Sequence, residues 1–215
     1  LGHGGADLLI LTGVVEIVDD LLQVLLGLIL AGHVGKADAL GGLDIDLGIG
    51  LPCAEHHGPG ASGPVRQLLG HQLADGDEQD FTVNLWNSEN YIPELGLVAE
   101  LNGKLIGHIL LTRMYVIQED GSKFESLLVA PLSVLLEYRD HGVGSALMKE
   151  GLRRGRELGY KAAFLCGDPE YYHRFGFKSI REFGLTNPEI PEPYAMGYEL
   201  VPGALDQVTG VVKLT

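Results

Sequence analysis

Basic side chains are scarce in this sequence. Its 215 residues include 15 Lys and Arg against 29 Asp and Glu, which gives a formal net charge of -14 at pH 7. A protein that binds nucleic acid normally presents a basic stripe to the phosphates, so this balance argues against a nucleic-acid partner. The acidic composition fits a protein in solution, and it weakly favours a cationic amine over an acidic molecule as a substrate.

Cysteines and long apolar runs are also few. Cys53 and Cys166 are the only cysteines, and they lie far apart, so we predict no disulfide framework and expect a reducing, cytoplasmic setting. The apolar run Leu21 to Ala31 falls well short of the roughly 20 residues that span a bilayer. We therefore predict no transmembrane helix and no membrane partner, and we find no signal peptide led by Lys or Arg.

Residues 1–80 differ in texture from the remainder. Lys36 and Arg66 are their only basic residues, and glycine-rich segments follow one helical pattern at Val14 to Leu30. This segment is either a regulatory or partner-binding module or an artefact of the gene model, so we divide the chain into an atypical segment, 1–80, and a folded domain, 81–215. The cluster of Cys53 with His56 and His57 lacks a second ligand pair, so we expect a solvated loop and no metal.

The most informative stretch is residues 127–158. A strand-like apolar run, Leu127 to Leu136, leads through Arg139, Gly142 and Gly144 into a helical pattern. Such a junction directs unpaired backbone N–H groups and the positive end of the helix dipole at one spot, which suits an anion, most often a phosphate. The two glycines alone are equally compatible with an ordinary strand-to-helix turn.

The order of elements around this stretch predicts an α/β (α+β) fold with a mixed, mainly antiparallel sheet. Asn102-Gly103 between two apolar runs predicts a hairpin, whose second arm turns back at residues 119–122 into the central strand. After the helix, Lys161 to Cys166 reads as a strand that the crossover rule places parallel to the central strand and beside it. A short helix is predicted to begin at Asp168-Pro169, and two further strands follow.

Three motifs in this order resemble the GNAT N-acetyltransferase superfamily. Arg139-x-x-Gly142-x-Gly144 is similar to its acetyl-CoA motif, R/Q-x-x-G-x-G/A, and residues 168–177 are similar to its Y-x-x-x-G-F segment. Residues 200–205 resemble the tail of a branch of bacterial predicted N-acetyltransferases. The resemblance covers roughly residues 85–205.

The resemblance implies a cofactor site between two parallel strands that splay apart, with flanking helices. The pantetheine arm of acetyl-CoA would lie in the gap as a pseudo-strand. Pro131, which lacks an N–H, favours a bulge in the central strand. The arm is expected on the backbone of Leu132, Ser133 and Val134, and the pyrophosphate on Arg139 and on the N–H groups of Asp140, His141, Gly142, Val143, Gly144 and Ser145.

For catalysis the resemblance implies direct attack of a neutral primary amine of a small molecule on the thioester. Tyr172 stands at the family's acid position, Tyr171 is its rival, and both are alternatively core aromatics of a short helix. No general base is assigned. Some family members use a glutamate of this strand, but Leu128 stands at the matching depth, and Glu125 faces the opposite way in a regular strand. A water chain or His108 is possible, although a lone histidine is more often structural. Cys166 is expected to be a buried small hydrophobe.

Two functions remain open from the sequence. The first is a GNAT-type N-acetyltransferase, which the motifs favour. The second is a non-catalytic acetyl-CoA-binding or protein-interaction module, because residues 1–80 show no clear equivalent of the first strand and two helices that cover the acceptor pocket in the family. Whether the chain forms a homodimer is also left open.

Overall fold

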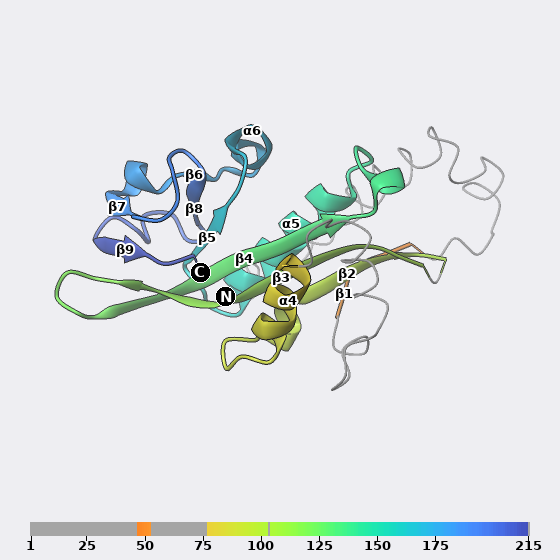
Figure 1. Cartoon of the computed structure of the whole chain (residues 1–215), viewed down its shortest axis with the longest axis horizontal. Helices are drawn as coiled ribbons and strands as arrows, with labels where there is room; N and C mark the ends of the chain where they lie inside the picture. The colour runs from red at the N-terminus through yellow and green to blue at the C-terminus, as the bar shows by residue number, and fades with distance from the viewer. Residues whose placement is uncertain (1–46, 53–76, 103, 215) are drawn as a thin grey trace, which may run out of the picture.

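One mixed sheet of nine strands forms the centre of the protein (Figure 1). The structure, a computed structural model, describes residues 47–52, 77–102 and 104–214. The expected helix at residues 14–30 and the cluster at residues 53–57 lie outside the described residues. The strands are β1 (Leu47–Pro52), β2 (Gly96–Leu101), β3 (Lys104–Ile117), β4 (Lys123–Val134), β5 (Ala162–Cys166), β6 (Lys178–Ser179), β7 (Leu185–Thr186), β8 (Ala195–Glu199) and β9 (Gly210–Val212).

Seven strands follow one another across the sheet in the order β1-β2-β3-β4-β5-β8-β6. Strand β9, which the sequence did not predict, pairs with the end of β3 and with β7. The helices are α4 (Asp77–Trp86), α5 (Val143–Glu157) and α6 (Pro169–Tyr172), with short 3-10 turns η2 (Pro93–Leu95), η3 (Leu136–Tyr138), η4 (His173–Phe175) and η5 (Ile180–Phe183). No helix among the described residues is long and apolar enough to cross a membrane.

The β2–β3 hairpin forms where the Asn-Gly pair predicted it. Leu101 pairs with Lys104 across the turn, and Asn102 adopts a positive φ of 50°. Asparagine tolerates this left-handed conformation better than most residues, which explains why a two-residue turn forms here. Strand β3 then runs for 14 residues and turns back into β4, so the two make the long ribbon that crosses Figure 1.

Strand β4 contains the bulge that Pro131 predicted. Ile109 of β3 pairs with Leu132, and Leu111 pairs with Val129, so one residue of β3 lies opposite two residues of β4. Proline cannot donate a ladder hydrogen bond, and a bulge removes the need for one. The prediction of a local break in pairing is confirmed.

Beyond this bulge, β4 and β5 separate. They run parallel and are paired at Leu127 with Ala163 and at Leu128 with Phe164. Past these pairs β4 continues along β3 while β5 continues along β8, which leaves the β5-facing edge of β4 without a partner strand among the described residues. The predicted parallel pair, its splay and the mixed α/β fold class are confirmed.

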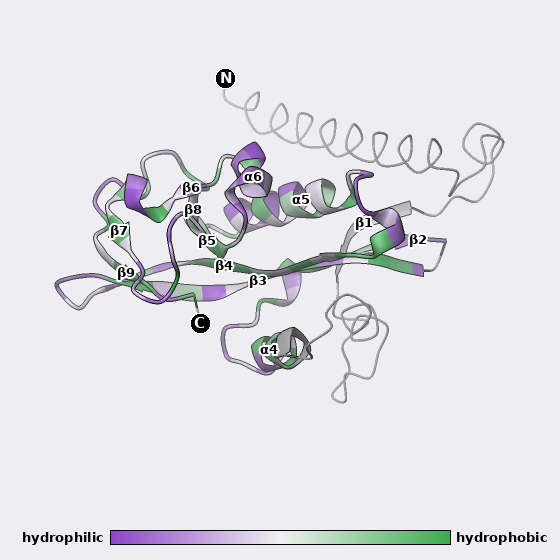
Figure 2. Ribbon diagram, turned by 45° about the horizontal axis from the view of Figure 1, so that its top comes forward, coloured by the Kyte–Doolittle hydropathy of each residue, from purple (hydrophilic) through white to green (hydrophobic). Residues whose placement is uncertain are grey.

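Helix α5 covers one face of the sheet together with α6, and α4 lies on the other face (Figure 2). Two glycines let α5 approach closely: a Cβ on Gly151 would come within 2.8 Å of the Leu111 side chain, and one on Gly155 within 2.6 Å of the Leu127 side chain. The helix axis is therefore held against β3 and β4 at a distance that alanine would not permit. This fixes the first turn of α5 relative to the end of β4.

Part of the segment before residue 80 belongs to the fold. Strand β1 pairs antiparallel with β2, from Leu47 opposite Leu101 to Pro52 opposite Leu97. The sequence analysis found no first strand in residues 1–80, and that reading was wrong. The pattern was missed because LGIGLP contains two glycines and a proline, which normally signal a turn. The boundary at residue 80 also falls inside α4.

Candidate functional site

The loop between β4 and α5 ends in a left-handed glycine. Gly142 has φ 85° and ψ -5° and immediately precedes Val143, the first residue of α5. Its carbonyl oxygen accepts the N–H of Ala146 at 2.9 Å, which starts the helical ladder. The N–H groups of Val143, Gly144 and Ser145 have no partner within the helix and point outward from its first turn. With the positive end of the helix dipole, these donors favour an anion.

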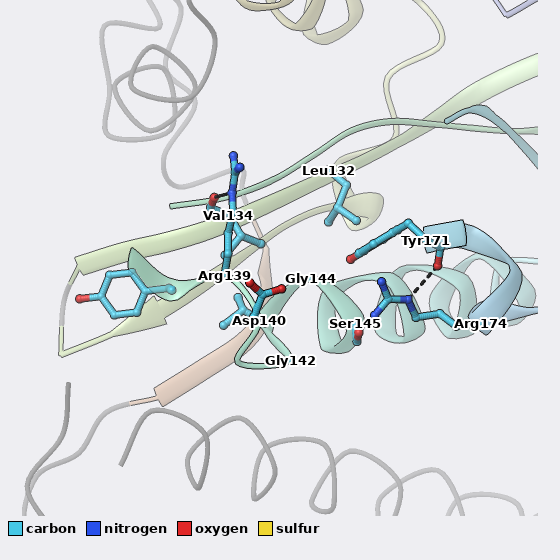
Figure 3. A pocket seen from close by; sticks show the side chains of 11 residues that line it. Leu132, Val134, Arg139, Asp140, Gly142, Gly144, Ser145, Tyr171 and Arg174 are labelled. Atoms are coloured by element: carbon cyan, nitrogen blue, oxygen red, sulfur yellow. Dashed lines mark hydrogen bonds between the residues drawn. The ribbon is translucent and has the colours of Figure 1, made fainter. Parts of the chain in front are cut away.

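A pocket of about 620 Å³ lies over this turn (Figure 3). Its lining combines the end of β4, the loop, the first turn of α5 and two side chains from α6 and η4. The lining residues are Leu132, Val134, Tyr138, Arg139, Asp140, Gly142, Val143, Gly144, Ser145, Tyr171 and Arg174.

All but two of the residues predicted to bind the cofactor line this pocket. Ser133 is 6% exposed and lies opposite His108 of β3, so its side chain points to the sheet face away from Leu132 and Val134. The Nδ1 atom of His141 donates to the carbonyl oxygen of Arg139, a contact that closes the loop on itself. The prediction for both residues concerned backbone groups, and it remains a prediction.

Two charged residues of the loop, Arg139 and Asp140, line the pocket. Arg139 donates from Nε to the carbonyl oxygen of Val134 at 3.2 Å, which ties its guanidinium to the end of β4. Asp140 has a positive φ of 62°. Burial raises the pKa of Tyr171; the charge of Arg174 lowers that pKa and the carboxylate of Asp140 raises it, so both charges lie near this phenol.

Two neighbouring tyrosines of α6 enter different environments. Tyr171 reaches across the pocket, and its hydroxyl lies 2.7 Å from where a Cβ on Gly144 would be. Tyr172 instead is not part of the pocket lining: it packs against Gly167, where a Cβ would come within 2.1 Å of its ring, and makes an edge contact with Phe177. Burial, followed by the nearby Tyr171 and Cys166, raises the pKa of Tyr172 to about 12, so it is a neutral hydrogen-bond donor at physiological pH.

The model of the acetyltransferase (GNAT) family matches residues 65–177. The chain belongs to this family. YjhQ of Escherichia coli K12, named an uncharacterized N-acetyltransferase, is 35% identical over 135 residues, which cover 63% of this chain and 72% of YjhQ. YhbS of the same strain, also named an uncharacterized N-acetyltransferase, is 35% identical over 122 residues, or 55% of this chain and 71% of YhbS.

Solved structures give the same family. YhbS from Escherichia coli, solved in complex with CoA, superposes with a TM-score of 0.63 and 28% identity over 78% of this chain and 87% of its own. A GNAT family acetyltransferase from Brucella melitensis, solved in complex with acetyl-CoA, gives a TM-score of 0.58 over 77% of this chain and 93% of its own. Its identity of 24% shows the likeness of fold alone. The resemblance drawn from three short motifs is thus confirmed at the level of family and fold.

The side chain of Cys166 is exposed, which corrects the expectation of a buried residue. The other four residues of β5 are buried, and Cys166 is the last residue of the strand, past the point where β4 has turned away. The strand pattern predicted burial because it could not show where the neighbouring strand ends. Partial burial raises the pKa of this thiol, so the thiolate is disfavoured.

The acid–base candidates other than tyrosine lie away from the pocket. Glu125 forms an ion pair with Arg113 at 2.8 Å, toward the opposite end of β4 from the pocket. His108 is fully buried on the opposite sheet face, with its ring 5.9 Å from that of Trp86 in an edge contact. Among the described residues, the pocket lining contains the anion-binding turn, two tyrosines and two arginines, and its only acid is Asp140 of the loop.

Sequence reasoning missed two residues of the lining. Tyr138 is the last residue of the turn η3, and Lys104 lies 5.0 Å above its ring while pairing with Glu137. Arg174 reaches the pocket from η4. In the sequence, Tyr138 and Arg174 look like ordinary surface residues. Only the three-dimensional structure shows that both side chains line the pocket.

Proposed function

We propose that this protein is an N-acetyltransferase that transfers the acetyl group of acetyl-CoA to a primary amine of a small molecule by direct attack. The observation that carries the proposal is the pocket at the start of α5, where left-handed Gly142 and the first-turn N–H groups face Arg139 beside the separated edge of β4. Membership in the GNAT family supports it, as do the relatives solved with CoA and acetyl-CoA.

The residues that line the pocket fit acetyl-CoA, the acetyl donor. The N–H groups of residues 140–145 and the guanidinium of Arg139 would hold the pyrophosphate. Leu132 and Val134 line the pocket beside the edge of β4 that lacks a partner strand, where the amide groups of the pantetheine arm would find backbone partners. Gly144 leaves room there that a Cβ would fill, since Tyr171 already approaches it.

Tyr172 would act on the leaving group. Acetyl-CoA supplies an activated thioester, and attack by a neutral amine develops negative charge first on the carbonyl oxygen and then on sulfur. An N–H from the separated edge of β4 would stabilise the oxyanion. A phenol with a pKa of about 12 stays protonated and donates a hydrogen bond to the sulfur as charge develops there. The C–S bond breaks as the carbonyl re-forms, and CoA leaves as a thiolate that takes the phenol's proton only as far as the site raises thiolate basicity. The proton left on the amine nitrogen passes to solvent to give the amide.

The alternative, a non-catalytic binding module, rested on missing elements before the hairpin. Strand β1 pairs with β2, and α4 lies on the sheet face opposite α5, so part of what was missing is in place. The presence of β1 and α4 therefore weakens the case for a non-catalytic module, and only an activity assay tests whether acetyl transfer occurs. The two functions share the donor pocket and differ in whether thiol is released.

The test is acetyl transfer by the full chain. We expect acetyl-CoA to bind in isothermal titration, and some members of a panel of primary amines to release thiol above an amine-free control. Tyr172→Phe should bind acetyl-CoA as the wild type does and lower kcat by about a hundredfold, the lower end of what acid–base groups contribute. Absence of binding would refute the proposal, and binding without thiol release from any amine would favour the module. A full rate in Tyr172→Phe would remove only the role of this residue.

A further inference from the structure

Arg174 lies on the pocket wall opposite the loop. It belongs to η4, and Figure 3 shows its side chain turned from that wall toward the first turn of α5. Among the described residues no carboxylate forms an ion pair with Arg174, whereas Arg113, Arg153 and Arg154 each bind one. Its charge therefore faces the pocket without an ion-pair partner among the described acids, although Asp140 lines the same pocket.

Tyr171 fixes the position of this guanidinium. The Arg174 Cζ atom lies 3.9 Å from the centre of the Tyr171 ring, and Nε donates to the carbonyl oxygen of Tyr171 at 2.8 Å. These contacts use one N–H and one flat face, so the terminal N–H groups stay available at the edge of the fork. The same tyrosine reaches Gly144 in the first turn of α5, so the guanidinium is held close to the helix N-terminus.

The charges of the lining make Arg174 decisive for an anion. Arg139 and Arg174 are its cations and Asp140 is its acid, which leaves one net positive charge. Without Arg174, the side chains of the lining would sum to zero, and the backbone N–H groups alone would attract the ligand. A diphosphate held between the helix N-terminus and two guanidinium groups would have donors on both sides.

We propose that Arg174, positioned by the ring of Tyr171, is a second cationic ligand for the diphosphate of coenzyme A, reaching it from the wall opposite Arg139. The proposal rests on the proposed function, since it assumes that CoA is the ligand. It assigns to the pocket a preference for thioesters that carry a diphosphate over those that end at pantetheine.

The experiment compares three ligands that differ in phosphate content: CoA, dephospho-CoA, which keeps the diphosphate, and pantetheine, which has no phosphate. Affinities are measured by titration, or by competition with CoA where binding is weak. Arg174→Gln should weaken CoA and dephospho-CoA equally, by about tenfold or more, and leave pantetheine unchanged. The loss should shrink at high salt because screening weakens the charge that was removed.

Three results would overturn the proposal. If Arg174→Gln lowers the affinity for CoA alone, Arg174 binds the 3′-phosphate instead. If the affinity for pantetheine falls equally, the effect is unrelated to phosphate. If the affinity for all three ligands is unchanged, Arg174 has no role in binding. If the wild type binds no CoA, the proposed function fails as well, whereas wild-type binding with an unaffected Arg174→Gln removes only this inference. Arg181→Gln, at an exposed arginine of η5 paired with Glu192, is the matched control and should change nothing.

Variants of Tyr171 test its positioning role. Tyr171→Phe keeps the ring under Arg174 and should retain CoA affinity, while Tyr171→Leu removes the ring and should weaken CoA by a smaller factor than Arg174→Gln. Arg174→Lys keeps the charge without the planar fork and should fall between Arg174→Gln and the wild type. Equal affinity of Tyr171→Phe and Tyr171→Leu would exclude the stacking contact as the means by which Arg174 is held.

Discussion

The two walls of the pocket are built in different ways. One wall is formed by β4, a strand of 12 residues, and α5, a helix of 15 residues whose glycines bring it tightly onto the sheet. The other wall is α6, a helix of 4 residues, followed by η4, a 3-10 turn of 3 residues. The first wall offers backbone N–H groups, and the second offers side chains.

This difference matches what each wall has to do. Backbone donors cannot adjust individually, so they need a frame that is fixed by the core. The second wall is held by aromatic contacts: the ring centres of Tyr171 and Tyr172 lie 5.0 Å apart, and those of Tyr171 and Phe175 lie 5.6 Å apart. Side chains on a short element adjust by rotation, which suits residues that meet a ligand. We expect changes at buried, packed positions of either wall to affect stability, and changes at residues that line the pocket to affect ligands.

The largest stability effect is expected at Glu150 in the first wall. Its side chain is 8% exposed and accepts from Arg153 at 2.8 Å and from Arg154 at 2.7 Å. Glu150→Ala removes the buried carboxylate that binds both guanidinium groups, while Arg153 keeps its pair with the exposed Glu157, and should lower the free energy of unfolding by about 3 kcal/mol. Urea denaturation measures this loss. Glu157→Ala removes an acid that is 60% exposed and should cost under about 0.5 kcal/mol, so equal losses would contradict a buried frame.

In the second wall, Tyr172 should make the stability of the protein depend on pH in the alkaline range. Its pKa is raised, mainly by burial, from 10.0 to about 12, so the folded protein retains this proton where the unfolded chain loses it. Stability from this group is complete below pH 10 and is lost as the pH rises toward 12, by about 2 to 3 kcal/mol. Urea denaturation at pH 9, 10 and 11 should show a steeper fall for the wild type than for Tyr172→Phe. Parallel curves would mean that the phenol is not buried.

A pair of glycine substitutions within α5 compares its face packed on the sheet with its first turn, which lines the pocket. In Gly155→Ala the new Cβ would come within 2.6 Å of the Leu127 side chain, which is fully buried and cannot move aside, so we expect a loss of about 1 to 2 kcal/mol in stability. In Gly144→Ala it would meet the Tyr171 hydroxyl at 2.7 Å, the end of a half-buried side chain that can rotate. That variant should keep its stability and bind CoA less tightly. Thermal melts and CoA titrations on both proteins distinguish the two effects. A loss of stability in Gly144→Ala and weaker CoA binding in Gly155→Ala would contradict the prediction.

The smallest effect is expected at Asp140. Its carboxylate lines the anion pocket, and its φ of 62° suits asparagine almost as well as aspartate. Asp140→Asn removes the negative charge while keeping the loop, and should tighten CoA binding by about threefold at low salt, with less gain at high salt. Asp206→Asn, a change of the same charge outside the pocket lining, serves as the control for net charge. Weaker binding in Asp140→Asn would show that the carboxylate itself supports the loop.

Local chemistry made much of the fold predictable. Asn102-Gly103 predicts a hairpin because few other residues accept positive φ, and Gly142, which has a φ of 85°, precedes the helix for the same reason. Asp168 caps α6 by accepting the N–H of Glu170 at 2.9 Å, as its place before Pro169 predicts. The strand-helix-strand order predicted the parallel pairing of β4 with β5, because the helix returns the chain to the end of the sheet from which β4 started.

Other features followed from contacts between distant segments. Strand β1 was missed because its glycines and proline oppose a strand locally, and pairing with β2 overrides that preference. Strand β9 was missed because it is short and gains its place from the free end of β3. The exposure of Cys166 depends on where β4 leaves β5, which no pattern within β5 contains.

The sequence by itself determined the family, the order of the elements and the anion-binding loop, since each follows from backbone preferences of a few adjacent residues. Only the tertiary structure decided which side chains meet at that loop. Tyr171 and Tyr172 are neighbours in sequence, yet one lies in the pocket beside Gly144 and the other rests on Gly167. Arg174 joins the lining because α6 folds back toward α5. Such choices depend on distances between elements, and those distances are set by packing across the whole sheet.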